Sequence, residues 1–296
     1  MIYLFISICC SVTVAVLLKL ARRYKIKIVQ AVTWNYLFAI FLSFIFYRPG
    51  LNELISAPVN SVYIALGVLL PVVFWFLAGS IRGIGIVKTD IAQRLSLFIP
   101  ILASYFIFKE QFSSLKIAGL AVGFVAIFFT LYKKTAQKNQ GLNWLYPILV
   151  FLGFGIIDIL FKKIAQIKVI PYTSSLIVVF ILAFIISLAS VFYLSAVKKQ
   201  KLEFINFICG CILGFFNFFN ILFYLKAHRA MADNPSVVFA AMNMGVIIAG
   251  SLVGIFIFKE KLNKLNYWGL LLALLAIVLI TNVIGTSYQA LLLLFR

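Results

Sequence analysis

Few charged residues stand inside the long apolar stretches of this sequence, where a charge is costly to bury unless it is paired or hydrated. They include two pairs with a spacing of four residues, Asp90 with Arg94 and Asp158 with Lys162. On a helix this spacing puts both members on one face, where their charges neutralise each other. The alternative for Arg94 is a binding role. Its planar guanidinium would project into a cavity, oriented by Gln93 or Asp90, and bind a carboxylate or phosphate.

Uncharged polar residues form a second candidate site. Asn217, Asn220 and Tyr224 follow one another at spacings of three and four residues within a Phe-rich stretch, which places them on one helical face. An asparagine in hydrocarbon is costly without a partner, so this face is expected to contact protein or a wet cavity. Taken singly, each residue fits an ordinary interhelical contact equally well. The residues that could complete a substrate pocket are Asn35, Tyr36, Trp75 and Asn243.

The sequence lacks the residue patterns that an enzyme, a primary pump or a channel would need. A membrane-embedded enzyme would need a nucleophile, an acid–base pair or a metal cluster, yet the chain has seven acidic residues and one histidine. We therefore expect no catalytic residue, no metal site and no cofactor. A primary pump would need a phosphate-binding Gly-rich loop ending in Lys-Ser or Lys-Thr, and a channel would need a filter sequence. Neither pattern is found in the sequence.

Long apolar segments are the elements that must hold these residues. The 296-residue chain is 65% hydrophobic and 11% charged, and a soluble protein of that size could not bury so many apolar side chains. A bilayer helix needs about 20 apolar residues, and about ten such segments are predicted. Their ranges are roughly 2–20, 28–47, 61–80, 88–108, 116–132, 144–164, 171–196, 204–225, 235–258 and 266–284. The predicted fold class is an all-α integral membrane protein, and the predicted location is the cell membrane.

An internal repeat divides the chain. Residues 106–110 and 256–260 share the sequence Phe-Ile-Phe-Lys-Glu, and the match continues without a gap to Gly119 and Gly269. We expect two inverted five-helix repeats, 1–137 and 138–286, followed by a short tail, 287–296. The polar linker 133–141 is the natural boundary between them. The glutamates that end the two copies of the pentapeptide, Glu110 and Glu260, are interpreted as interfacial anchors or tight-turn partners.

A family resemblance follows from these features. About ten predicted helices, a five-plus-five repeat, and Phe-Lys-Glu at the ends of the fourth and ninth helices resemble the drug/metabolite transporter superfamily, EamA type. Pro100 within the fourth helix fits this pattern, whereas Gly250 and the polar pair Gln93-Arg94 depart from it. The resemblance implies an inverted-repeat carrier. Its central cavity would be lined mainly by the first, third, fourth, sixth, eighth and ninth helices.

The net charge of +19 has a membrane explanation. Most Lys and Arg residues lie between apolar segments, where they meet lipid headgroups, so membrane lipids and not nucleic acid are the expected partners. The basic connections before 28, around 133–141 and before 204 would be cytoplasmic by the positive-inside rule, with both termini outside. The family resemblance implies cytoplasmic termini. An even number of helices puts both termini on one side, and the sequence leaves that side open.

These observations favour a secondary carrier that moves a small polar metabolite by alternating access between the two repeats. An amino acid or another small carboxylate is the favoured substrate, because Arg94 would recognise an anionic group. Asp158 could carry a coupling proton or sodium ion. Exchange or facilitated diffusion is the favoured alternative, because Lys162 can hold Asp158 ionised as its partner. A monomer or weak homodimer is expected. The alternative function is a membrane-embedded structural or assembly protein, or a flippase for a lipid intermediate.

Overall fold

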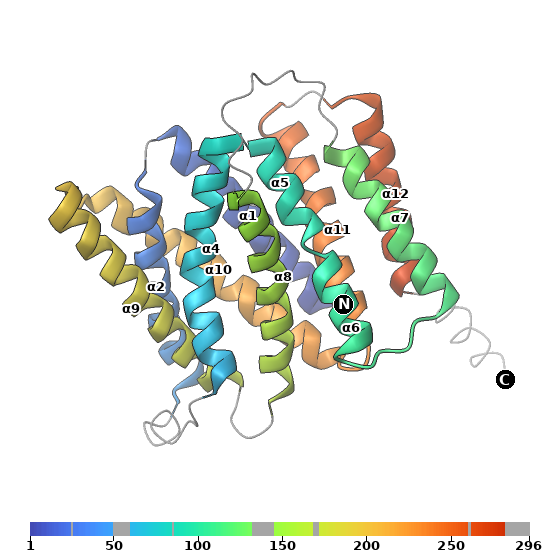
Figure 1. Ribbon diagram of the computed structural model, residues 1–296, viewed down its shortest axis with the longest axis horizontal. Coiled ribbons are helices and arrows are strands. Elements are labelled where there is room, and N and C mark those ends of the chain that lie inside the picture. Colours follow the sequence, from blue (N-terminus) through green and yellow to red (C-terminus); the bar gives the residue numbers. More distant parts are fainter. Residues whose placement is uncertain are drawn as a thin grey trace. The chain divides into compact units, whose positions relative to one another are not determined.

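Helices account for all the regular secondary structure that the computed structural model describes (Figure 1). The described residues are 1–24, 26–49, 60–84, 86–131, 145–167, 172–259 and 262–281. The helices are α1 (Ile2–Arg23), α2 (Ile28–Tyr47), α4 (Ser61–Ile84), α5 (Ile86–Leu95), α6 (Phe98–Phe106), α7 (Ser114–Leu131), α8 (Leu145–Gln166), α9 (Tyr172–Lys198), α10 (Phe204–Ala230), α11 (Pro235–Phe256) and α12 (Lys264–Thr281). The linker 133–141, Glu260, the tail 287–296 and the side chain of Asp90 lie outside the described part.

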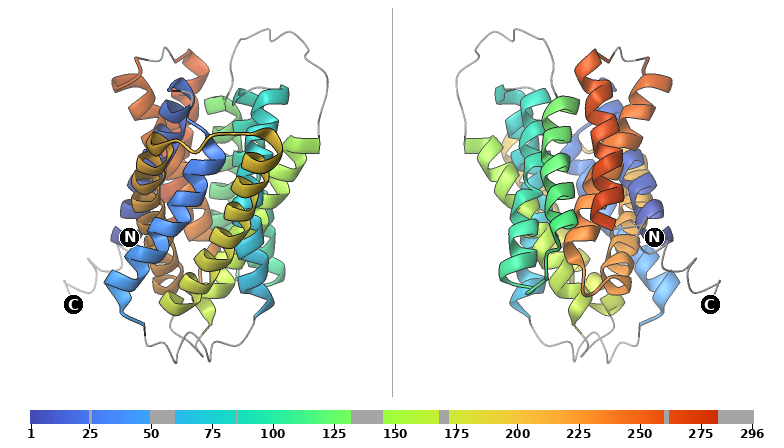
Figure 2. Two further views of the ribbon diagram at one scale, coloured as in Figure 1. Left: turned by 90° about the vertical axis from the view of Figure 1, so that its left-hand side faces the viewer. Right: turned by 90° about the vertical axis from the view of Figure 1, so that its right-hand side faces the viewer.

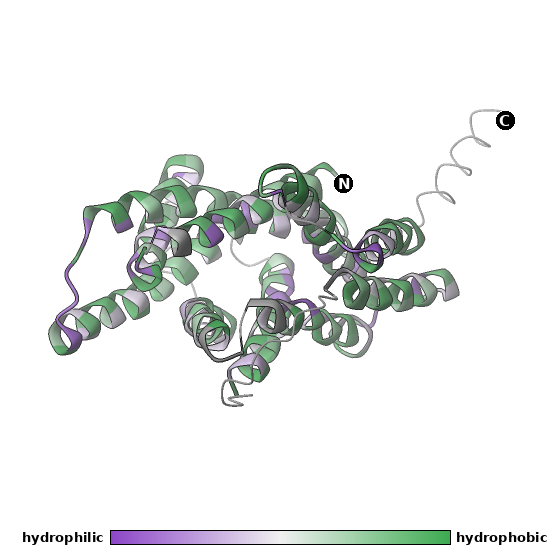
Figure 3. Ribbon diagram, turned by 90° about the horizontal axis from the view of Figure 1, so that it is seen from above, coloured by the Kyte–Doolittle hydropathy of each residue, from purple (hydrophilic) through white to green (hydrophobic). Residues whose placement is uncertain are grey.

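The protein is an all-α, multi-pass membrane protein. Within the described residues, seven helices are long and apolar enough to cross a bilayer: α1, α2, α4, α9, α10, α11 and α12. Hydrophobic residues cover most of the helix lengths (Figure 3), and large apolar side chains such as Phe204 and Phe256 are about three-quarters exposed, at 75% and 76%. In a bilayer such side chains meet lipid. Each of the ten predicted apolar segments falls on a helix, and the fourth falls on two.

The fourth predicted segment is interrupted between α5 and α6. Pro100 accounts for the break, because its ring removes one N–H and collides with the carbonyl group of Ser96, four residues earlier. The freed backbone groups find local partners. The Ile99 amide donates to the Ser96 carbonyl at 3.0 Å, and Ser96 Oγ donates to the Gln93 carbonyl at 2.5 Å. Such local hydrogen bonds allow a helix to break at membrane depth.

The helices form two compact units, each assembled from distant parts of the chain. The first unit holds Met1–Gly79 and Ile156–Ala230, and the second holds Ser80–Gly155 and Met231–Arg296. Helices α4 and α8 therefore each contribute to both units. Both units draw on residues before and after the predicted repeat boundary at 137, so the spatial units differ from the segments that repeat in sequence.

Helix α10 is the central element of the first unit, where it packs on α1 and α2, while α2 also packs on α9. Two glycines one turn apart permit the close approach of α10 to α2. A methyl group on Gly210 would lie 2.7 Å from the Ala31 carbonyl oxygen, and one on Gly214 would lie 2.7 Å from the Asn35 carbonyl oxygen. This is the small-xxx-small packing typical of membrane helices, in which backbone meets backbone.

Replacing Gly214 with Ala is expected to destabilise the protein by about 1–3 kcal/mol, because the new methyl group meets a backbone atom that cannot rotate away. The measurement is the midpoint of thermal unfolding of the purified protein in detergent. Gly250→Ala is the matched control, since a methyl group at that position in α11 would have no other atom within 4 Å. Equal stability of the two variants would contradict the proposed close contact.

In the second unit, α7 and α12 pack side by side and antiparallel (Figure 2). The contacts are reciprocal, because Gly119 near the start of α7 lies against Ile280 near the end of α12, and Gly269 near the start of α12 lies against Thr130 near the end of α7. Gly119 precedes Gly269 by 150 residues, and Thr130 precedes Ile280 by the same interval, which is also the interval of the repeated pentapeptide. Asn266 adds hydrogen bonds from its Nδ2 to the carbonyl oxygens of residues 129 and 130, at 3.0 and 2.8 Å.

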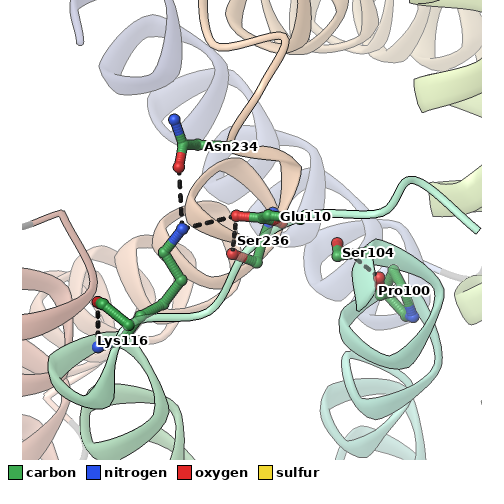
Figure 4. A network of polar contacts seen from close by, with 7 residues as sticks. Pro100, Ser104, Glu110, Lys116, Asn234 and Ser236 are labelled. Atoms are coloured by element: carbon green, nitrogen blue, oxygen red, sulfur yellow. Dashed lines mark hydrogen bonds and ion pairs between the residues drawn. The ribbon is translucent and has the colours of Figure 1, made fainter. Parts of the chain in front are cut away.

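A buried ion pair joins three parts of the second unit (Figure 4). Glu110 follows α6 and is 5% exposed. Its Oε1 accepts hydrogen bonds from Lys116 Nζ at 2.7 Å and from Ser236 Oγ at 2.6 Å, and its Oε2 accepts one from the Ser236 amide at 2.9 Å. Lys116 Nζ also donates to Asn234 Oδ1 at 2.9 Å. Glu110 therefore caps the first turn of α11 from another element, which is a tertiary role that the tight-turn interpretation did not include.

Candidate functional site

The polar face of α10 connects this helix to three neighbours within the first unit. Asn217, Asn220, Tyr224 and His228 recur at spacings of three and four residues, so they lie along one side of the helix. The first three contact α2, α1 and α8 in turn. We call these four residues the polar strip. The sequence analysis predicted that this face contacts protein or a wet cavity. In the structure its polar residues contact three different helices.

At one end of the polar strip, Asn217 Nδ2 donates to Asn35 Oδ1 on α2 at 3.1 Å. Asn35 and its neighbour Tyr36 are both fully buried. Among the described residues, neither Asn35 Nδ2 nor the Tyr36 hydroxyl has a hydrogen-bond partner. A buried donor without an acceptor is costly, so these two groups are able to bind water or a ligand atom.

One turn further along α10, Asn220 interacts with α1. Ser7 Oγ lies 2.9 Å from Asn220 Oδ1 and 3.0 Å from the Asn220 carbonyl oxygen. Ser7 is fully buried, and the sequence prediction did not include it. A single hydroxyl within an apolar segment gives no distinctive signal, because serine is common where membrane helices pack.

Asp158 on α8 lies beside the far half of the polar strip, where Tyr224 donates its hydroxyl hydrogen to Asp158 Oδ1 at 2.9 Å. The Tyr224 ring packs edge-on against Phe161, with a centroid distance of 6.1 Å, and against His228, with a distance of 4.7 Å. The sequence spacing predicts Lys162 as the partner of Asp158, and Tyr224 is a partner from a different helix. Asp158 and Lys162 lie one turn apart on α8, and the Lys162 side chain is completely buried.

His228 lies within the last turn of α10, beyond the end of the eighth predicted segment at residue 225. The helix continues to Ala230, and His228 is fully buried. Hydropathy falls near Lys226 and Arg229, which makes the segment look shorter than the helix. The carboxylate of Asp158, the phenol of Tyr224 and the imidazole of His228 thus form a cluster of titratable groups within the first unit.

The remaining predicted residues of α5 and α11 belong to the second unit. Gln93 and Arg94 stand in the last turn of α5, directly before the break, and both are half-buried. Asn243 on α11 donates its Nδ2 to the carbonyl oxygen of Phe239 in the same helix, at 3.0 Å, and is also half-buried. The structure therefore divides the predicted set. Seven of its ten residues lie in the first unit and three in the second.

Trp75 lines a groove in the first unit and does not join the hydrogen-bonded residues of the polar strip. The groove has a volume of about 570 Å³ and is formed by Val29 of α2, Trp75 of α4, and five residues of α9 between Ile186 and Leu194. Near the other end of these helices, Tyr63 and Ser175 are hydrogen-bonded at 2.9 Å, and Gly67 lies against Leu182. Helices α4 and α9 are therefore in close contact at their starts, and the groove lies further along both.

A second polar cluster, also absent from the sequence prediction, fixes the connection between α9 and α10. Gln30 on α2 donates to the Lys201 carbonyl at 3.0 Å and accepts a hydrogen bond from Asn206 Nδ2 at 2.7 Å. The backbone amide of Lys27 donates to Asn206 Oδ1 at 3.1 Å, and Lys27 Nζ pairs with Glu203 at 2.9 Å. These contacts hold the start of α2 against the α9–α10 connection. Polar residues near helix ends are common, so spacing alone gives no signal for this cluster.

Comparison with known proteins places the chain in a family. It is 42% identical to an uncharacterized protein of Haemophilus influenzae over 283 residues, which cover 93% of this chain and 95% of that protein. The chain belongs to the family of that protein. No family model matches the sequence. A solved crystal structure resembles this family member with a TM-score of 0.69 and 13% identity, over 95% of this chain and 96% of its own, and this likeness concerns the fold alone.

Proposed function

We propose that the protein is a secondary carrier for a small polar metabolite with an anionic group, such as an amino acid or another small carboxylate. The observation that supports this proposal best is the break between α5 and α6 beside Arg94. Carriers bind substrates at discontinuous membrane helices, where backbone and side-chain groups are released from regular helical bonding. A guanidinium at such a break offers two parallel hydrogen bonds to a carboxylate.

The resemblance to EamA-type transporters supports the same proposal. We infer ten membrane-spanning helices in two inverted five-helix repeats, and the reciprocal α7–α12 contacts are those expected if a twofold axis relates the repeats. Alternating access requires bodies that keep their internal packing during the cycle. The glycine-mediated and hydrogen-bonded helix contacts within each compact unit support this part of the proposal.

The titratable cluster suggests how transport could be driven. Carboxylates within membrane helices commonly carry coupling protons or ions in pumps and transporters. Asp158 is bonded to Tyr224 from another helix, so a change in its protonation would alter a contact between α8 and α10. We therefore assign proton coupling to Asp158 in preference to exchange or facilitated diffusion.

The carrier proposal is tested by counterflow in sealed vesicles. Purified protein is reconstituted with one unlabelled metabolite inside, and uptake of trace labelled metabolite is followed across a panel of amino acids and small carboxylates. A carrier accumulates label transiently with its own substrate only, whereas an assembly protein shows none. Absence of counterflow for every panel member, with the protein still folded, would contradict the proposal.

For the metabolite identified in this way, Arg94→Lys is expected to raise the half-saturating concentration by about tenfold or more, because lysine keeps the charge but loses the two-pronged geometry. Arg94→Gln is expected to weaken recognition further and to shift preference toward neutral substrates. Arg48→Lys is the control, since Arg48 is the residue that follows α2 in the other unit. Reduced stability of Arg94→Gln with unchanged affinity would show that Arg94 has a structural role only.

A further inference from the structure

The groove between α4 and α9 has an apolar wall and a basic end. Ile186, Ser190 and Leu194 recur every four residues along α9, and Lys198 continues the same face one turn later. From Ile186 to Lys198 the helix rises by about 18 Å, at about 1.5 Å per residue. The groove therefore leads along one helix face from hydrocarbon-like side chains to an ammonium group.

More positive charge gathers at this end. Lys198, Lys199 and Lys201 are exposed, and Lys27 is held beside them by its hydrogen bond to the Lys201 carbonyl at 2.9 Å. Glu203 pairs with Lys27. Within the described residues, no carboxylate pairs with Lys198 or Lys199. Hydrogen bonds of Gln30 with the Lys201 carbonyl and with Asn206 hold the connection between α9 and α10 in place. The positive charges are therefore positioned before any ligand binds.

The aromatic residues of the groove indicate its depth in the membrane. Tyr193 lines the groove one turn before the end of α9 and is 60% exposed, and Trp75 lines it from α4. Tyrosine and tryptophan are enriched at the level of lipid headgroups, where one part of the ring is apolar and another is wet. The basic end of the groove thus fits the headgroup region, and the apolar wall fits the acyl region.

We propose that this groove is a binding site for an anionic phospholipid. One acyl chain lies against Val29, Trp75 and the α9 face, and the phosphate lies at Lys198 and Lys199. A zwitterionic lipid has no net charge, so it would make the same apolar contacts but would not be attracted to the lysines to a comparable degree. The electrostatic attraction of surface lysines favours the binding of anionic lipids. The proposal is independent of the carrier assignment, because it uses neither Arg94 nor Asp158. Trp75, which the sequence analysis placed with a substrate pocket, lines this groove instead.

The test uses phospholipids with brominated acyl chains, which quench the fluorescence of a tryptophan that they contact. The full chain is reconstituted with brominated phosphatidylglycerol or brominated phosphatidylcholine, and Trp75→Phe identifies the Trp75 contribution among the four tryptophans. Brominated phosphatidylglycerol is expected to quench Trp75 at a lipid fraction about tenfold lower than brominated phosphatidylcholine requires. The double variant Lys198→Gln/Lys199→Gln should lose this preference, whereas Lys264→Gln, an exposed lysine in the second unit, should keep it.

Three further results decide the source of the signal. Ala189→Leu, which fills the groove, is expected to reduce quenching of Trp75 by both lipids while the lysines remain. Equal quenching by the two lipids in the unmodified protein would mean non-specific contact with surrounding lipid and would overturn the proposal. Protection of Trp75 from both lipids, together with a dimer in solution, would show that a second copy of the chain covers the groove and would overturn it as well.

Discussion

Replacing Asp158 with Asn is expected to abolish accumulation of substrate against its gradient while leaving exchange of internal for external substrate intact. Asparagine has nearly the same shape and keeps an oxygen that can accept the hydrogen bond from Tyr224, but it cannot take up or release a proton. The measurement compares both activities in one vesicle preparation, with an imposed proton gradient for accumulation and none for exchange.

Tyr224→Phe is the matched variant for this experiment. It removes the hydroxyl group that bonds Asp158 at 2.9 Å but keeps the carboxylate and the ring that packs against Phe161 and His228. Accumulation should fall in this variant without being lost. Unchanged accumulation in Asp158→Asn would remove this residue from the coupling mechanism. Loss of both activities would instead assign it to substrate binding or to the packing of α8 on α10.

Glu110→Ala is expected to reduce the free energy of unfolding by about 3–5 kcal/mol, because it leaves the buried ammonium group of Lys116 without its carboxylate partner. It also leaves the Ser236 amide at the start of α11 without an acceptor from the protein. Low yield of folded protein and an early thermal transition in detergent are the expected observations. Glu110→Leu with Lys116→Met removes both charges together, and this double variant should recover part of the loss.

A more exposed ion pair in the first unit provides the control. Lys27 Nζ and Glu203 Oε1 are 2.9 Å apart, close to the 2.7 Å between Lys116 Nζ and Glu110 Oε1, but their side chains are 29% and 47% exposed. Solvent screens such a pair, so Glu203→Ala should cost no more than about 1 kcal/mol. A similar loss for Glu110→Ala and Glu203→Ala would show that burial does not strengthen the Glu110 network.

The helices were largely predictable from sequence, and their interruptions were not. The second predicted segment, 28–47, coincides with α2, because a run of about 20 apolar residues has few alternatives in a bilayer. Pro71 and Pro100 look alike in sequence, yet α4 continues through Pro71 while the chain breaks before Pro100. Neighbouring groups can supply hydrogen-bond partners for the backbone around a membrane proline whether the helix continues or breaks. The presence of a proline alone therefore did not predict the break.

The polar face of α10 was predictable as a face, but its partners were not. The spacing of Asn217, Asn220 and Tyr224 required contacts with protein, whereas the choice of Asn35, Ser7 and Asp158 depends on how distant segments pack. Local spacing also favoured Lys162 for Asp158, because sequence reasoning detects i,i+4 neighbours more readily than tertiary ones. The same reason applies to Glu110. Its position beside Lys109 favoured an interfacial anchor or a tight-turn partner, whereas its burial and its hydrogen bonds depend on α7 and α11.

The way in which the first unit is assembled has a consequence for biosynthesis. Asn35 and Asn217 are 182 residues apart in the chain. At about 5–20 residues per second, the ribosome needs roughly 10–40 s between these two residues. During this interval α2 is in the membrane with its asparagine unsatisfied and with the surface that meets Gly210 and Gly214 uncovered. A membrane chaperone or the insertion machinery that retained α2 until α10 emerged would shield both features. A chain stalled before residue 204, where α10 begins, would leave both uncovered.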